Sequence, residues 1–132
     1  MIITLCGSMK FEQAFKEWNE RLTMAGHICF TVSVYPSDKD NNKDWYTPQQ
    51  KARLDQAHKE KIVASQAVLV INPGAYIGES TAQEIACARF HKKIVLFTCP
   101  TQDMAYNERM ICSHQGCFDP ISNRPPCALC YE

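Results

Sequence analysis

The stretch from Ala67 to Phe90 constrains the fold of this chain more than any other. It begins with the apolar run Ala67–Ile71, which is typical of a strand buried on both faces of a parallel sheet. A loop with proline and glycine follows, and the apolar pattern of Ile85–Phe90 is helical. A strand, a loop and a helix in this order predict one unit of an open α/β sheet, in which ligands bind at the loop after the strand.

The rest of the chain repeats this alternation, and its apolar periodicity indicates where each element lies. The expected strands are Ile2–Cys6, His27–Val34, Ala67–Ile71 and Ile94–Phe97, and the expected helices are Phe11–Ala25, Pro48 to about Ser65, and the one that ends near Phe90. We therefore predict a three-layer, Rossmann- or flavodoxin-like α/β fold with a parallel sheet of four to five strands and helices on both faces.

Two segments interrupt the pattern. Tyr35–Thr47 is a polar loop in which Trp45 and Tyr46 either cover a bound base or anchor the loop to the core. After Pro100 the alternation stops, and Met104–Ile111 is predicted as a short helix. We expect a nucleoside- or nucleotide-binding domain at residues 1–100 and a Cys-rich extension at 101–132.

Charge and hydropathy exclude several classes of partner. The chain has 14 basic and 14 acidic residues, and this balance argues against nucleic-acid binding as its main function, since nucleic-acid-binding surfaces are usually basic. No apolar run approaches the ~20 residues that span a bilayer, and the N-terminus does not resemble a signal peptide. We therefore expect a cytoplasmic protein with no nucleic-acid and no membrane partner.

Seven of the eight cysteines fall into two groups, and the eighth, Cys99, ends the fourth apolar run. Cys6, Cys29 and Cys87 fall within predicted strands or helices and are expected to be small core residues. A second group near the C-terminus has the spacing of a structural zinc knuckle, with a final Cys-x-x-Cys turn; the alternative is a tail of free thiols. The candidate zinc ligands are Cys112, His114, Cys117, Cys127 and Cys130. No Walker loop and no G-x-G-x-x-G fingerprint is present, so we expect no organic cofactor.

A candidate substrate site is formed by the loops after the first and third strands. In the first loop Ser8 precedes a helix, where it either binds a ligand or caps the helix, and Lys10 either binds a phosphate or is a surface lysine. In the third, Tyr76 either contacts the substrate or packs the loop. The candidate substrate-binding residues are Gly7, Ser8, Met9, Lys10, Gly74, Gly78, Glu79, Ser80 and Thr81.

Glu84 lies one helical turn beyond Ser80, where its carboxylate is a candidate nucleophile or general base. The alternative is a capping box, with Ser80 or Thr81 as the N-cap and Glu84 as its partner. His58 is a second candidate, since it lies on the helix before the third strand. A single histidine on a helix is more often structural than catalytic.

The run Tyr76-Ile-Gly-Glu-Ser-Thr-x-x-Glu84-Ile resembles the signature of the nucleoside 2-deoxyribosyltransferase-like family, including its short Rossmann-like members. The resemblance covers about residues 2–98 and implies cleavage or transfer of the N-glycosidic bond of a nucleoside or nucleotide. It implies Glu84 as the catalytic nucleophile and a homodimer or larger homo-oligomer. The Cys-rich tail is an addition to the family core.

The chemistry requires a second group that protonates the leaving base, beside the carboxylate that attacks the sugar. The candidate acids are Asp55, His58, Glu79 and Tyr76. Transferase members tend to have an aspartate shortly before the nucleophile, where this chain has Gly78 and Glu79, so hydrolysis is as well supported as base exchange. The alternative function is a non-catalytic nucleotide-binding sensor with a zinc-stabilised interaction tail.

Overall fold

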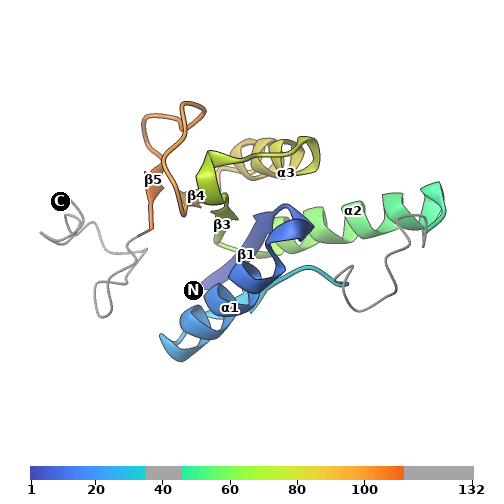
Figure 1. Cartoon of the computed structure of the whole chain (residues 1–132), viewed down its shortest axis with the longest axis horizontal. Coiled ribbons are helices and arrows are strands. Elements are labelled where there is room, and N and C mark those ends of the chain that lie inside the picture. The colour runs from blue at the N-terminus through green and yellow to red at the C-terminus, as the bar shows by residue number, and fades with distance from the viewer. Residues whose placement is uncertain (35–45, 112–132) are drawn as a thin grey trace, which may run out of the picture.

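The computed structural model describes residues 1–34 and 46–111 (Figure 1). These residues form a five-stranded parallel sheet with the strand order β2-β1-β3-β4-β5. The strands are β1 (Ile2–Gly7), β2 (Ile28–Phe30), β3 (Ala67–Ile71), β4 (Ile94–Phe97) and β5 (Arg109–Met110), and the helices are α1 (Glu12–Met24), α2 (Pro48–Ala64) and α3 (Glu79–Phe90). The predicted α/β class is confirmed.

Helices cover both faces of this sheet, which gives three layers. Helix α1 covers one face, and α2 and α3 cover the other (Figure 1). Phe15 and Leu22 of α1 pack against Leu5 and its neighbours, whereas Ile62 of α2 and Ile85 of α3 belong to the core on the opposite side. Every residue of β3 is buried, as expected for a central parallel strand covered on both sides.

The neighbouring strands β1 and β3 end at the same position in the sheet. Gly7 pairs with Ile71, and a side chain on Gly7 would bring its Cβ to 2.6 Å from the Ile71 carbonyl oxygen. This close approach explains the glycine at the end of β1. The loops that follow the two strands therefore leave the sheet side by side.

The ends of the helices follow local sequence signals. Thr47 and Gln50 form a reciprocal capping box at the start of α2, where Pro48 occupies the first turn, as the sequence indicated. Gly26 follows α1 with a φ of 98°, and the amide of His27 donates to the Leu22 carbonyl at 3.0 Å. None of the helices in the described residues combines the length and the apolar character that a bilayer crossing needs.

Two expected elements differ in the structure. The predicted helix at Met104–Ile111 is wrong, because this segment instead forms turns and the edge strand β5. Arg89 of α3 accounts for the difference: its guanidinium donates to both carboxylate oxygens of Glu108, at 2.8 and 2.7 Å, and holds the segment across the end of the sheet. The second strand is shorter than expected, since β2 pairs with β1 only as far as Thr4.

Candidate functional site

The candidate site lies at the carboxyl ends of β1 and β3. In the strand order 2-1-3-4-5, the chain adds β2 on one side of β1 and all later strands on the other side. The topological switch point therefore lies between β1 and β3, and open α/β sheets bind ligands at such a point. The two loops touch there: Lys10 Nζ lies 3.4 Å from the centroid of the Tyr76 ring, and Phe11 packs against the same ring in an edge-on geometry at 6.0 Å. The two loops that the sequence analysis assigned to one site therefore contact each other.

The start of α3 separates the two interpretations of Glu84. The N-cap is Gly78, and no side chain caps the helix. Ser80 and Thr81 consequently lie inside the first turn, and Glu84 lies too far along the helix for a capping box. The capping interpretation of Glu84 is therefore wrong.

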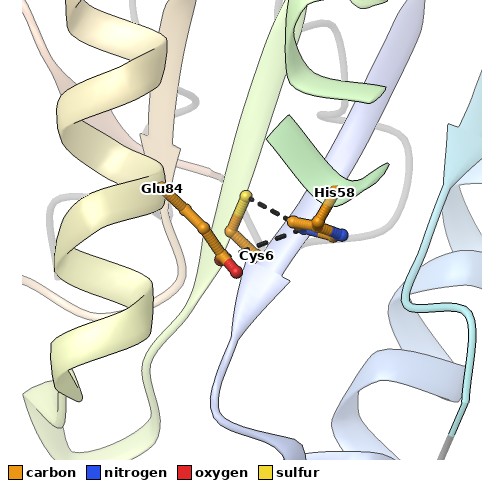
Figure 2. Close-up of side chains that lie close together, drawn as sticks. All are labelled: Cys6, His58 and Glu84. Atoms are coloured by element: carbon orange, nitrogen blue, oxygen red, sulfur yellow. Dashed lines mark hydrogen bonds and ion pairs between the residues drawn. The ribbon is translucent and has the colours of Figure 1, made fainter. Parts of the chain in front are cut away.

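Glu84 instead meets two side chains from other elements, Cys6 at the end of β1 and His58 of α2 (Figure 2). His58 Nε2 lies 3.7 Å from Cys6 Sγ and 3.9 Å from Glu84 Oε2. Cys6 is fully buried, and the side chains of His58 and Glu84 are 8% and 17% exposed. We call these three residues the Cys6–His58–Glu84 cluster.

The Glu84 carboxylate is poorly solvated. Its Oε2 is buried and has no hydrogen-bond partner among the described residues. Burial raises the pKa of Glu84 from 4.5 to about 7, and the negative charge of Asp55 adds to this effect. A carboxyl group with this pKa exchanges its proton near neutral pH, as a general acid or base requires.

The pKa of His58 is shifted in the opposite direction, below its ordinary value. Burial, and then the positive charge of Lys61, lower its pKa from 6.5 to about 4, although a hydrogen bond to the Leu5 backbone favours the protonated ring. The imidazole is therefore neutral at pH 7, and its contact with Glu84 is not an ion pair there. Nε2 is the ring nitrogen that faces Cys6 and Glu84.

The loop after β3 is fixed to β4 by Asn72. The side chain is fully buried: Nδ2 donates to the Cys99 carbonyl at 2.9 Å, and Oδ1 accepts from the Thr98 hydroxyl and the Cys99 amide at 3.0 and 2.9 Å. Buried amide groups with all their partners hold backbone rigidly. Asn72 thus sets where the loop carrying Tyr76 leaves the sheet.

The same loop contains backbone strain. Gly74 and Ala75 both have left-handed backbone, with φ values of 65° and 63°. Alanine in this region costs roughly 1–2 kcal/mol, whereas glycine does not.

We expect Ala75→Gly to raise the free energy of unfolding by about 0.5–1 kcal/mol, since Ala75 is exposed and loses only the strain. Thermal and urea unfolding would measure this. The matched control is Ala86→Gly, an exposed position inside α3, which should lower stability by about 1 kcal/mol. A loss of stability in both variants would show that Ala75 is not strained.

The other predicted site residues lie in three places. Ser8 caps the 3₁₀ turn Met9–Phe11, its hydroxyl accepting from the Lys10 amide at 3.4 Å. Gly74 lies in the turn after β3, and the exposed Glu79 and Ser80 lie in the first turn of α3. The Thr81 side chain is instead buried in the core. Trp45 and the proposed zinc ligands Cys112, His114, Cys117, Cys127 and Cys130 lie outside the described residues.

Two residues of the site were not identified from sequence. Cys6 was expected only to fill the core, and nothing local shows that its thiol faces a histidine 52 residues away. Asn72 had a usable signal, since an amide side chain directly after a fully apolar strand must find hydrogen-bond partners in the core.

Solved structures of similar fold include a 2-deoxyribosyltransferase from Bacillus psychrosaccharolyticus, with 16% identity, a TM-score of 0.57, and coverage of 80% of this chain and 77% of that chain. The chain has the fold of a 2-deoxyribosyltransferase. A conserved protein from Enterococcus faecalis V583 aligns at 19% identity and a TM-score of 0.50, over 74% of this chain and 62% of that chain. A CMP N-glycosidase from Clostridium botulinum aligns at 16% identity and a TM-score of 0.48, over 74% of this chain and 67% of that chain.

No family model and no curated protein sequence matches this chain. The similarity to the deoxyribosyltransferase therefore concerns the fold, and it confirms the architecture that the sequence resemblance implied.

Proposed function

We propose that this chain cleaves or transfers the N-glycosidic bond of a nucleoside or nucleotide, with Glu84 as the nucleophile. The observation that carries the proposal is the buried Glu84 oxygen without a hydrogen-bond partner, at the switch point of the sheet. A fold does not build an unsatisfied carboxylate for stability, and such groups concentrate at sites of reaction. The fold shared with a 2-deoxyribosyltransferase agrees with this chemistry.

In the first step a Glu84 carboxylate oxygen attacks the anomeric carbon of the sugar. The bond from this carbon to the base nitrogen breaks, its electron pair goes to the base, and the base takes a proton. A covalent ester between the sugar and Glu84 remains. The pKa of Glu84 near 7 leaves a large ionised fraction at neutral pH, and poor solvation makes the carboxylate more reactive.

In the second step water or another base attacks the same carbon and releases Glu84. The attacking water gives up a proton, and the neutral Nε2 of His58, which faces Glu84, is placed to accept it. With a pKa of about 4, the His58 ring is neutral at pH 7, so His58 is excluded as the acid that protonates the first leaving group. Asp55, Glu79 and Tyr76 remain the candidates for that acid.

Lys10 and Tyr76 form the polar and aromatic side of the proposed substrate site. The Lys10 ammonium group lies over the Tyr76 ring, so a substrate would meet both groups at one place. The aromatic ring can contact its base or ribose, and the ammonium group can bind a 5′-phosphate. This arrangement favours a nucleotide over a free nucleoside.

The proposal is tested by incubating the purified protein with ribo- and deoxyribonucleosides and their 5′-monophosphates, with and without a second free base. Chromatography then measures released and exchanged base. We expect release from at least one monophosphate, with Lys10→Met lowering kcat/KM for monophosphates more than for nucleosides.

The outcomes separate the candidate functions. Base release without an acceptor indicates a hydrolase, and exchange only with an acceptor indicates a transferase. Tight nucleotide binding without either product would contradict the enzyme proposal and favour the sensor.

A further inference from the structure

The geometry points to a second use of the same side chains: Cys6, His58 and Glu84 form a binding site for one zinc-class divalent cation. The site differs from the zinc knuckle expected in the tail, and it is built from the folded core of the domain. Its three ligand atoms all lie within 4.8 Å of one another.

The separations between the ligand atoms fit a tetrahedral metal. Bond lengths of about 2.3 Å to sulfur and about 2.0–2.1 Å to nitrogen and oxygen place neighbouring ligand atoms roughly 3.4–3.6 Å apart. The Cys6 Sγ to His58 Nε2 distance is 3.7 Å, and the His58 Nε2 to Glu84 Oε2 distance is 3.9 Å. Metal binding would shorten these two separations by roughly 0.1–0.5 Å. The third separation, between Cys6 Sγ and the Glu84 carboxylate, lies within 4.8 Å.

The orientation of His58 suits a metal ligand. Histidines that bind metals usually donate their second ring N–H to a carbonyl or carboxylate, which fixes the lone pair of the first nitrogen on the metal. His58 Nε2 faces the other two ligands (Figure 2), so a lone pair on this nitrogen can bind a metal while the other ring nitrogen keeps its N–H.

The donor set selects the class of cation. One thiol, one imidazole and one carboxylate favour zinc or cobalt and disfavour magnesium or calcium, which prefer oxygen ligands. The three ligands come from β1, α2 and α3, so the fold holds them in place before binding. The unpartnered Glu84 oxygen gains a bond, and the Cys6 proton is released to solvent as the sulfur binds the metal.

The consequence for catalysis rests on the proposed function. A cation bound to Glu84 withdraws the electron pair that would attack the sugar, so we infer that zinc and substrate exclude each other. Zinc would then be an inhibitor that is competitive with the substrate and reversed by a chelator.

Cobalt absorbance tests the metal site without any activity assay. A thiolate ligand gives a charge-transfer band in the near ultraviolet, and a tetrahedral site gives intense visible bands. To remove metal binding by the tail, the 132-residue chain used in this test carries serine in place of four cysteines, Cys112, Cys117, Cys127 and Cys130. We expect one equivalent of Co²⁺ to produce both sets of bands, and Zn²⁺ to displace it.

Variants assign the bands to residues. In this background Cys6→Ser should abolish the charge-transfer band, and His58→Gln should weaken binding on the order of 100-fold or more, at least as much as the loss of an outer-shell partner. The matched control is Cys29→Ser, which removes a thiol that packs on the opposite face of the sheet and should leave the spectrum unchanged. Circular dichroism checks that each variant is folded.

Absence of the cobalt bands, or bands that survive Cys6→Ser, would overturn the metal site. Neither result bears on nucleotide cleavage, which the substrate panel decides separately. Cobalt binding at the cluster, together with no base release by the metal-free protein in the presence of a chelator, would instead support the metal site and contradict the proposed function.

Discussion

Replacing Glu84 by glutamine should reduce base release by at least about 10³-fold while the protein stays folded. Glutamine has nearly the volume of glutamate and keeps the packing against Cys6 and His58, but its amide cannot form the glycosyl ester. The loss should appear in kcat and in kcat/KM alike, because the bond to the sugar forms only after the substrate binds.

Initial rates of base release measure this effect, using the best substrate from the panel. The matched control is Glu60→Gln, which makes the same exchange on α2 at a carboxylate whose side chain is 57% exposed and pairs with Arg53. Glu60→Gln should stay within about twofold of the wild type, because exposed pairs of this kind contribute little. Full activity in Glu84→Gln would exclude Glu84 as the nucleophile.

A covalent adduct would distinguish a nucleophile from a general base. A substrate with fluorine at the 2′ carbon slows both steps, because the fluorine destabilises positive charge on the sugar. Mass spectrometry of the digested wild-type protein should find the sugar on the peptide that contains Glu84. Adduct on a different peptide would assign the nucleophile elsewhere.

The fold could be predicted from sequence because its strands are buried on both faces. Ala67–Ile71 and Ile94–Phe97 coincide with β3 and β4 in the structure, since an uninterrupted apolar run has no other environment in a small domain. The edge of the sheet was less predictable. β5 has only two residues, Arg109 and Met110, both exposed, and it forms where Glu108 meets Arg89, a pairing that no periodicity records.

Part of the site was also predictable, because buried apolar strands show where the loops between them lie. Glu84 stood out because its motif lies directly after the most apolar strand, and the loops that meet at Tyr76 and Lys10 follow from parallel topology. The partners of Glu84 depend on the packing of α2 against α3 and on which face of β1 the Cys6 side chain occupies. These are tertiary facts, and they decide the charge states of the cluster.

Those charge states lead to the second large effect, which concerns stability. The folded protein holds the Glu84 proton more tightly than the unfolded chain does, since burial raises the pKa from 4.5 to about 7. Glu84 therefore contributes fully to stability below its unfolded pKa, and this contribution is lost as the pH rises through 7. Above that pH the protein carries a poorly solvated charge.

Glu84→Gln removes the ionisation and should stabilise the protein at alkaline pH. A shift from 4.5 to about 7 corresponds to about 3 kcal/mol in the free energy of unfolding, at 1.36 kcal/mol for each pH unit. The gain over wild type should be near zero below about pH 4.5, grow up to pH 7, and level off above about pH 8.

Urea unfolding of both proteins from about pH 4 to 9, with a chelator present to keep divalent ions from the cluster, measures this difference. His58, whose pKa is lowered to about 4, destabilises the fold as the pH falls from 6.5, but it does so in both proteins and largely cancels in the difference. Glu60→Gln should shift the curve by less than about 0.5 kcal/mol at every pH.

A difference that stays flat with pH would mean that Glu84 is well solvated when charged, or that it pairs with a protonated His58, and either result would contradict the charge states derived above. The expected rise would instead show that the residue on which base release depends also weakens the fold at the pH where it is ionised. A residue that lowers stability where it is ionised is typical of the trade-off between stability and activity at functional sites. The stability curve therefore bears on the role of Glu84 even before a substrate is known.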